Sequence, residues 1–279
     1  MTKRSAAGND ERNGERMTKR SETDGNFGFL AYICNQFKNE DKPMKTIAAI
    51  LAGGSGLRVG GGVPKQLLPL GGKPVLEHSI AAFDAHPDVD CVVVVCREDL
   101  IPAVENLVLR GGYRKVLGVI AGGDDRSASS IAAVRFATDR ASETPLHEYK
   151  LLLHDAARPL IDSQTITHCI NALDDYDAAE VVAPATDTVV LMRPDGLLKE
   201  VLPRETIGLV QTPQGFRLNV IAEAYRRAQA DPAFTATDDC SVVYKYLPGT
   251  SIRLVEGTPR NRKLTFPSDI KVLEALLKN

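Results

Sequence analysis

The sequence has few features that would direct it to nucleic acid, a membrane or a structural metal. Its 279 residues carry a net charge of −2, so no overall basic field favours nucleic acid. No apolar run reaches the length that spans a bilayer, which predicts a soluble chain with no membrane partner. The five cysteines are odd in number and lack metal-ligand spacing, so a reduced, cytoplasmic protein is the simplest interpretation.

The sequence also lacks the two common phosphate-binding signatures, although a glycine-rich loop is present within residues 48–66. A P-loop would end in Gly-Lys-Ser/Thr, whereas Gly60–Gly62 here lead into Val63 and Pro64. A dinucleotide-binding fingerprint would need Gly or Ala where Val59 stands. The loop therefore belongs to neither class.

The residues of this loop are nevertheless suited to a polyphosphate. The apolar run Ile47–Leu51 is typical of a buried strand, and it leads directly into the loop. Two cations follow, Arg58 and Lys65. Glycines let backbone N–H groups approach a ligand because no Cβ intervenes, and amides with fixed positive charges bind phosphate. The glycines concerned are Gly53, Gly54 and Gly56. The alternative is an ordinary glycine-rich connection with solvated charges.

Residues 1–43 differ in composition from the rest of the chain. They are rich in charged residues, Asn and Gly, and the pentamer Met-Thr-Lys-Arg-Ser occurs at both Met1 and Met17. Such a segment cannot bury enough apolar surface to order itself. We expect a disordered tail, or an upstream start, followed by one domain over residues 44–279.

From Lys45 onward, predicted strands alternate with predicted helices. Strands are expected at residues 47–51, 89–96, 116–121, 149–154, 181–184 and 252–256. Helices are expected at residues 73–85, 101–110, 127–140, 162–173, 219–230, 239–246 and from 268 onward. This order predicts an α/β fold with a mostly parallel, Rossmann-like sheet and helices on both faces. Ligands bind beyond the carboxyl ends of such strands, where the glycine loop, the segment after Ile120 and His154-Asp155 converge.

The alternation is interrupted by a predicted β-hairpin at about residues 186–206. Pro194-Asp195-Gly196 is a turn signal between short apolar runs. A hairpin that projects with exposed apolar residues needs a cover, and two arms embracing in a homodimer would supply it. Arg204 on this arm could grip a substrate phosphate in the partner's site, although a solvated charge is the simpler interpretation.

Two motifs follow strands at the expected ligand edge. In Gly122-Gly123-Asp124-Asp125-Arg126, with Ser129 beyond it, Asp124 and Ser129 could hydrogen-bond a base edge or merely cap a helix. In His154–Pro159, Asp155 could steer Mg²⁺-bound phosphates, hold substrate hydroxyls, or pair internally with Arg158. At Asp155 both kinds of role are compatible, whereas at Asp124 and Ser129 capping alone is an equal alternative.

The C-terminal third adds polar groups suited to a polyol and a third cation. Gln211–Phe216 and Thr237-Asp238-Asp239 supply neutral and acidic hydrogen-bonding groups. Lys263 follows a predicted edge strand in the segment Asn261–Thr265. Three separated cations with glycine amides between them suit the charge that develops on a transferring phosphoryl group.

Together these segments resemble the cytidylyltransferases that act on 2-C-methyl-D-erythritol 4-phosphate, over about Lys45 to Asn279. The motifs that carry the resemblance occur in the family's order. They are Pro-Lys-Gln, Gly-Gly-x-x-Arg-x-x-Ser, His-Asp-Ala-Ala-Arg-Pro, Gln-Thr-Pro-Gln-Gly-Phe, Thr-Asp-Asp and Val-Glu-Gly…Asn-x-Lys-x-Thr. The resemblance implies a nucleotide-diphospho-sugar transferase fold with a dimerisation arm, and transfer of CMP from CTP to a polyol phosphate with Mg²⁺ or another divalent cation.

The resemblance also implies three groups of site residues. Arg58, Lys65 and Lys263 match the family's transition-state cations. The residues matching the CTP site are Ala52, Gly53, Gly54, Gly56, Gly123, Asp124 and Ser129. The residues matching the polyol phosphate site are Asp155, Arg158, Thr188, Arg204, Thr212 and Thr237, with Asp155 also near the metal.

Three alternatives remain at this stage. Ribitol-5-phosphate cytidylyltransferases are close relatives that often carry glycine at the position of Gly54, whereas His-Asp-Ala-Ala and Gln-Gly-Phe favour methylerythritol. A sugar-1-phosphate nucleotidyltransferase lacks the Gly-Gly-x-x-Arg-x-x-Ser segment. A catalytically inactive nucleotide-binding protein would have no reason to keep all three cations.

Overall fold

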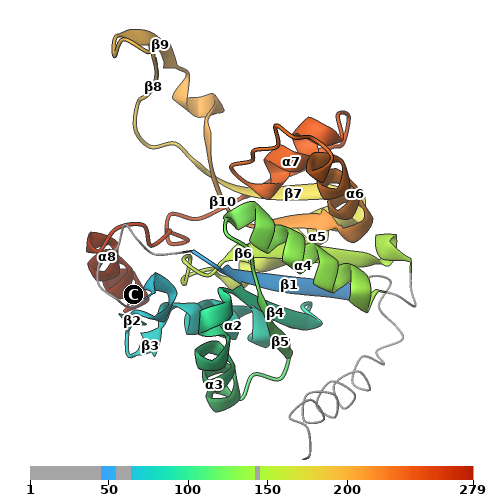
Figure 1. The fold of residues 1–279 in the computed structure, drawn as a ribbon. Helices are drawn as coiled ribbons and strands as arrows, with labels where there is room; N and C mark the ends of the chain where they lie inside the picture. Colours follow the sequence, from blue (N-terminus) through green and yellow to red (C-terminus); the bar gives the residue numbers. More distant parts are fainter. Residues whose placement is uncertain (1–44, 55–63, 142–144, 279) are drawn as a thin grey trace, which may run out of the picture. The chain divides into compact units, whose positions relative to one another are not determined.

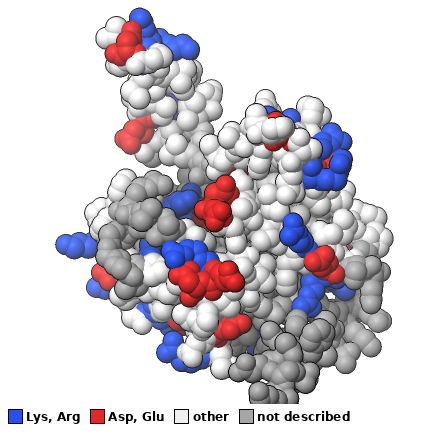
Figure 2. All heavy atoms as spheres, in the orientation of Figure 1, with Lys and Arg blue, Asp and Glu red and all other residues white. Residues whose placement is uncertain are grey.

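The structure, a computed structural model, describes residues 45–54, 64–141 and 145–278 (Figure 1). The tail predicted over residues 1–43, together with Gly56 and Arg58 of the glycine loop, lies outside the described residues. None of the helices in the described ranges is long and apolar enough to cross a membrane. Figure 2 shows Lys, Arg, Asp and Glu interspersed over the visible face, in keeping with the small net charge.

A seven-stranded mixed sheet forms the centre of the described residues, in the order β11-β7-β10-β6-β1-β4-β5. Its strands are β1 (Lys45–Ala52), β4 (Cys91–Cys96), β5 (Val116–Ala121), β6 (Tyr149–Asp155), β7 (Ala178–Pro184), β10 (Gly208–Arg217) and β11 (Ile252–Glu256). Every neighbouring pair is parallel except the two that involve β10, which runs antiparallel to both β6 and β7. The predicted α/β fold with a mostly parallel sheet is therefore confirmed.

The helices cover both faces of this sheet (Figure 1). They are α2 (Val75–Ala85), α3 (Ile101–Gly111), α4 (Arg126–Arg140), α5 (Ser163–Asp175), α6 (Leu218–Gln229), α7 (Asp239–Tyr246) and α8 (Ser268–Leu277). Buried residues of α2, α3 and α5 form one cluster with one face of the strands. Helix α4 packs on β1, β4 and β6, and it also contacts α6, which contacts α7. The predicted elements thus occur, with ends shifted by a few residues.

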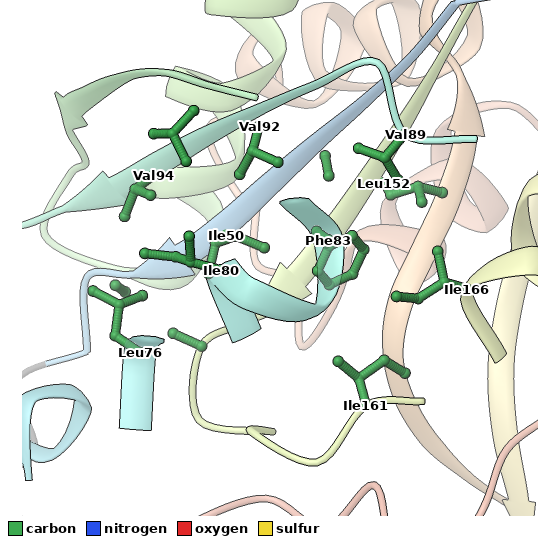
Figure 3. Packing of buried hydrophobic residues seen from close by; sticks show 14 of the residues in the cluster. Ile50, Leu76, Ile80, Phe83, Val89, Val92, Val94, Leu152, Ile161 and Ile166 are labelled. Carbon is green, nitrogen blue, oxygen red and sulfur yellow. The ribbon is translucent and has the colours of Figure 1, made fainter. Parts of the chain in front are cut away.

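Burial explains why the central strands are the most apolar. All six residues of β4, Cys-Val-Val-Val-Val-Cys, are buried, as expected for a parallel strand covered on both faces. Figure 3 shows Phe83 and Ile80 of α2 packed against Ile50 of β1 and Leu152 of β6. The four cysteines among the described residues are free and buried, so Cys91 and Cys96 are core residues, as predicted.

One helix begins later than its pattern predicts. Lys73 and Pro74 form a short strand, β3 (Lys73–Pro74), that pairs with β2 (Pro69–Leu70), and the helix starts at Val75. Pro74 occupies the N-cap with an extended ψ of 143°. Proline at this place is compatible with the start of a helix but cannot donate a backbone hydrogen bond, so the strand ends there.

The predicted hairpin is present as β8 (Val189–Met192) and β9 (Leu198–Leu202), which pair only with each other among the described strands. It extends away from the main sheet in Figure 1, where its two strands stand above β7 and β10. Most of its side chains are exposed, including Met192, Leu198 and Val201. The hairpin therefore has no apolar cover within the described chain.

A second, smaller core holds the segment after the last strand. It joins Leu70, Val75 and Ala157 to Leu264 and to Leu273 of α8. The backbone N–H of Leu264 donates to the carbonyl of Ala157 at 2.8 Å. Lys263 is therefore fixed next to the loop that follows β6.

Candidate active site

Three loops meet where the parallel strands end. In the register of the sheet, Leu51 lies opposite Asp155, and the last residues of β1 and β5, Ala52 and Ala121, both lie opposite Cys96. The glycine loop, the loop before α4 and the end of β6 consequently share one edge of the sheet. This is the edge at which the sequence pattern predicts a ligand.

Two residues of the glycine loop approach other predicted site residues. A Cβ on Gly53 would lie 2.8 Å from the hydroxyl oxygen of Ser129, so a larger residue there would displace this hydroxyl. A Cβ on Gly54 would lie 3.5 Å from Cε of Lys65, an ordinary contact distance. An alanine would fit at position 54, so packing does not require the glycine found there. Gly53, Ser129 and Lys65 are thus brought to one place.

In the loop before α4, one aspartate caps the helix and the other is exposed. Asp125 is the N-cap: its carboxylate accepts from the N–H of Ala128 at 2.7 Å. Asp124, one residue earlier, is exposed. A Cβ on Gly123 would lie 2.3 Å from Cβ of Ala128, so the turn into the helix needs glycine. Because Asp125 caps the helix, Asp124 is left available at its N-terminus.

Asp155 is the most highly connected acidic residue of this edge. Its Oδ2 accepts from Nζ of Lys263 at 2.6 Å, and its Oδ1 accepts from Nε of Arg126 at 3.2 Å. Burial by itself raises the pKa of this carboxyl, but Arg126 and Lys263 outweigh it and hold the pKa well below its usual range. Asp155 is therefore ionised at neutral pH and shared between two cations.

His154 is held neutral by its surroundings. Its Nε2 lies 3.1 Å from the carbonyl of Arg158, and its Nδ1 lies 3.1 Å from the hydroxyl of Thr212. That hydroxyl also accepts from the N–H of Asp155 at 3.0 Å. A proton on Nε2 and none on Nδ1 satisfies all three contacts. Burial lowers the pKa of His154 from 6.5 to about 4, so this imidazole is a structural group rather than a base.

Arg158 is held by backbone carbonyls rather than by Asp155. Its guanidinium donates to the carbonyl of Asn261 at 2.8 Å and to that of Val210 at 3.1 Å. The amide of Asn261 donates in turn to the carbonyl of Thr212 at 2.8 Å. The internal Asp155–Arg158 side-chain pair considered above is not the contact that forms. Arg158 instead joins the loop after β6 to β10 and to the last loop.

Comparisons with known proteins decide the family. Residues 46–279 match the family of 2-C-methyl-D-erythritol 4-phosphate cytidylyltransferases. The family's protein from Thermobifida fusca is 48% identical over 238 residues, which cover 84% of this chain and 94% of that protein. The chain belongs to this family. Its members are nucleotidyltransferases, and the predicted family resemblance is confirmed.

Two other relatives bear on the fold and on the acceptor. The crystal structure of 4-diphosphocytidyl-2C-methyl-D-erythritol synthase from Anaerococcus prevotii has a TM-score of 0.73, covering 85% of this chain and 97% of that chain at 24% identity. It shares the fold of this cytidylyltransferase-family chain. A bifunctional ribulose 5-phosphate reductase/CDP-ribitol pyrophosphorylase from Haemophilus influenzae is 36% identical over 236 residues, covering 84% of this chain and 48% of that protein.

The structure groups most of the site residues inferred from the cytidylyltransferase family. The residues around the sheet edge are Ala52, Gly53, Gly54, Lys65, Gly123, Asp124, Ser129, Asp155, Arg158, Thr212 and Lys263. Arg204 and Thr188 are exposed residues of the hairpin and its base, and Arg204 donates to the carbonyl of Thr186 at 3.0 Å. Thr237 is exposed just before α7. Among the described residues, none of these three shares a hydrogen bond or ion pair with the cluster at Asp155.

Sequence reasoning overlooked two side chains that shape this site. Arg126 contacts Asp155, although only Gly123, Asp124 and Ser129 of its motif are predicted as site residues. Gln66 is buried and donates to the carbonyl of Ala52 at 2.8 Å. Both lie within motifs that mark the cytidylyltransferase family, and this position in a motif was the only feature of the sequence that indicated a role for them. Motif position alone did not distinguish a ligand-facing residue from a supporting one.

The described residues do not form a resident metal centre. They contain no group of three or more His, Cys, Asp or Glu side chains placed to hold a metal ion. Both carboxylate oxygens of Asp155 are engaged by cations, so a metal ion bound there would have to compete with Lys263 or Arg126. The role of Asp155 near a metal that CTP phosphates carry stays a prediction.

The pKa of His154 predicts a specific pH dependence of stability. Because its pKa is lower in the folded state, the unfolded state binds more protons between pH 6.5 and about 4. Stability should therefore be lost as pH falls through this window, by on the order of 3 kcal/mol from this residue. In denaturant titrations, His154→Asn should show a shallower loss, whereas the exposed-site control His147→Asn should follow the native chain. Equal slopes for all three proteins would contradict the assignment.

Proposed function

We propose that this protein transfers CMP from CTP to 2-C-methyl-D-erythritol 4-phosphate and releases pyrophosphate, in isoprenoid precursor biosynthesis. The observation that supports this proposal is the family match over residues 46–279. The geometry agrees with it, because the start of the glycine loop, Lys65 and Lys263 lie at one edge of the sheet. Arg58, the third expected cation, lies outside the described residues.

The reaction we propose needs no covalent enzyme intermediate and no general base. A phosphate oxygen of the polyol phosphate, ionised at neutral pH, forms a bond to the α-phosphorus of CTP. The bond between that phosphorus and the bridging oxygen breaks, and pyrophosphate leaves with its electron pair. Neutral, buried His154 is consistent with chemistry that requires no base.

Cations and amides of this chain would stabilise the charge of the transition state. Lys65 lies beside Gly54 of the glycine loop, and Lys263 approaches Asp155 from the last loop. We assign cytosine and ribose to the side of Gly123, Asp124 and Ser129. The polyol phosphate is assigned to the side of Arg158 and Thr212.

Mg²⁺ remains part of the proposal as an ion that CTP carries on its phosphates. Magnesium is commonly bound through substrate phosphates and few protein carboxylates, which suits a site without a preformed metal cluster. When bound, it would offset phosphate charge. The cytoplasmic location also remains a prediction.

A second copy of the chain is proposed as the cover for the hairpin. Val190, Met192, Leu197, Leu198 and Val201 of this arm are between 41% and 74% exposed. Two arms that embrace would bury these side chains and carry Arg204 and Thr188 to the partner's site. This is the role in substrate binding that we propose for the two arm residues.

The acceptor is tested by pyrophosphate release from purified protein with CTP and Mg²⁺. We expect a strong preference for 2-C-methyl-D-erythritol 4-phosphate over ribitol 5-phosphate. The reverse preference would favour CDP-ribitol synthesis, the activity named in the Haemophilus influenzae relative. No release with either acceptor from protein shown to be folded would favour an inactive nucleotide-binding protein.

Adjacent cations in the last loop provide a test of the catalytic assignment. Lys263 contacts Asp155, whereas Arg262 turns to Asp269, with Nη2 and Oδ1 3.4 Å apart. Lys263→Met should lower kcat about 10²- to 10³-fold, the usual effect of removing one transition-state donor. Arg262→Met, its matched control, should stay within about twofold because Arg262 pairs with Asp269 rather than with Asp155. Equal losses in steady-state assays would refute the distinction.

The proposed dimer is tested by charge placed on the arm. Val201→Glu should shift sedimentation from dimer to monomer, because it would bury a carboxylate between two arms. Leu109→Glu, on α3 and 77% exposed, is the control and should leave the association state unchanged. A native chain that sediments as a monomer at micromolar concentration would contradict the dimer.

A further inference from the structure

A chain of alternating charges links the start of α7 to the last loop of the protein. Oδ2 of Asp239 lies 2.8 Å from Nη2 of Arg126. Nε of the same guanidinium donates to Oδ1 of Asp155 at 3.2 Å, and Oδ2 of Asp155 accepts from Nζ of Lys263 at 2.6 Å. Two carboxylates and two cations therefore alternate from a buried helix end to a residue of the proposed active site.

Asp239 is the fixed end of this chain. Its side chain is fully buried, and its Oδ1 accepts from the hydroxyl of Tyr225 at 2.6 Å. Its backbone N–H donates to Oε1 of Gln214 at 2.9 Å. It directly follows Asp238, whose capping box starts α7. Because hydrogen bonds fix both the backbone and the carboxylate of Asp239, its carboxylate holds a constant position against the guanidinium of Arg126.

Arg126 transmits this constraint to the sheet edge. Its side chain is 26% exposed, and its guanidinium hydrogen-bonds Asp155 and forms an ion pair with Asp239. Burial by itself lowers the pKa of Arg126, but Asp239 and Asp155 reverse this and raise it above its ordinary value. The cation is thus permanently charged and held from two sides.

The consequence for Asp155 concerns orientation. With Nη2 committed to Asp239, Arg126 offers Asp155 a single donor at Oδ1. Oδ2 is then free to hold Lys263. If Asp239 lost its charge, Arg126 could turn both nitrogens of its fork towards Asp155 and compete with Lys263 for the carboxylate. The position of Lys263 therefore depends on a residue two contacts away.

We propose that Arg126 is a positioning residue which, anchored by Asp239, orients Asp155 and through it the ammonium group of Lys263. The inference rests on the proposed function, because it assigns Lys263 to the transferring phosphoryl group. Asp239, the second aspartate of Thr-Asp-Asp, is then a support of the catalytic lysine rather than a group that binds the polyol.

Asp239→Asn is the first test. It keeps the shape of the side chain and a carbonyl oxygen for Tyr225, but it removes the charge that holds Arg126. We expect kcat to fall about 10- to 100-fold, as small misplacements of a catalytic group do, while the Kd for CTP changes less than about twofold. Arg126→Lys keeps the cation but loses the fork, and it should lower kcat in the same direction.

The control is Asp174→Asn on α5, whose partner Lys150 lies at the opposite end of β6 from Asp155. Asp174 pairs with the buried ammonium of Lys150 at 2.6 Å, so this change also removes one carboxylate charge from a cation, but at the end of β6 away from Asp155. It should cost stability without lowering kcat. The proposal would be overturned if kcat fell in both Asp239→Asn and Asp174→Asn in proportion to their loss of melting temperature.

A double-mutant cycle decides whether the effect passes through Lys263. Under single-turnover conditions with enzyme in excess, Asp239→Asn should slow the native chain but change the rate of Lys263→Met by less than about twofold. The same factor in both backgrounds would show an effect independent of Lys263 and would overturn the proposal. If Lys263→Met proves too slow to measure, the comparison of kcat, Kd and melting temperature above decides.

Failure of the inference is distinguishable from failure of the proposed function. The native chain is assayed first with CTP and 2-C-methyl-D-erythritol 4-phosphate, and absence of pyrophosphate release there would reject the proposed function itself. An active native chain whose Asp239→Asn and Arg126→Lys variants keep full kcat would reject the positioning role alone.

Discussion

The candidate active site depends on one shared carboxylate, that of Asp155. It ends a central strand and is contacted by Arg126 and Lys263, which are 29 and 108 residues away in the sequence. An ionised carboxylate buried at this edge would be strongly destabilising without such partners. Ion pairs of Asp155 consequently connect the start of α4, the end of β6 and the last loop at the edge where the sheet can receive a ligand.

The antiparallel strand β10 supplies the neutral part of the same site. It lies between β6 and β7, which places Thr212 against His154 and the backbone of Asp155. The small core around Leu264 then holds the last loop in reach. The neutral supports thus come from β10, next to the strand that carries Asp155, and they limit where the charged groups can go.

Much of the fold could be predicted from the sequence because its patterns reflect local physics. The β-branched run that became β4 is buried on both faces, and the apolar spacing of α2 matches a helix that covers the sheet. The start of α2 was less predictable, because Pro74 is compatible both with the end of a strand and with a helix cap. Asp124 was a plausible cap from the sequence, but in the structure the carboxylate of Asp125 accepts from the N–H of Ala128.

The sequence by itself determined the alternation of strands and helices, the ligand edge, the glycine loop and the family motifs, since each depends on residues close together in the chain. The tertiary structure alone decided which charged groups meet. Arg158 donates to backbone carbonyls, and Lys263 donates to the carboxylate of Asp155. Arg126 forms ion pairs with both Asp155 and Asp239. The physical reason is that a buried charge selects its partner by distance and direction after folding, and separation along the chain carries no information on either.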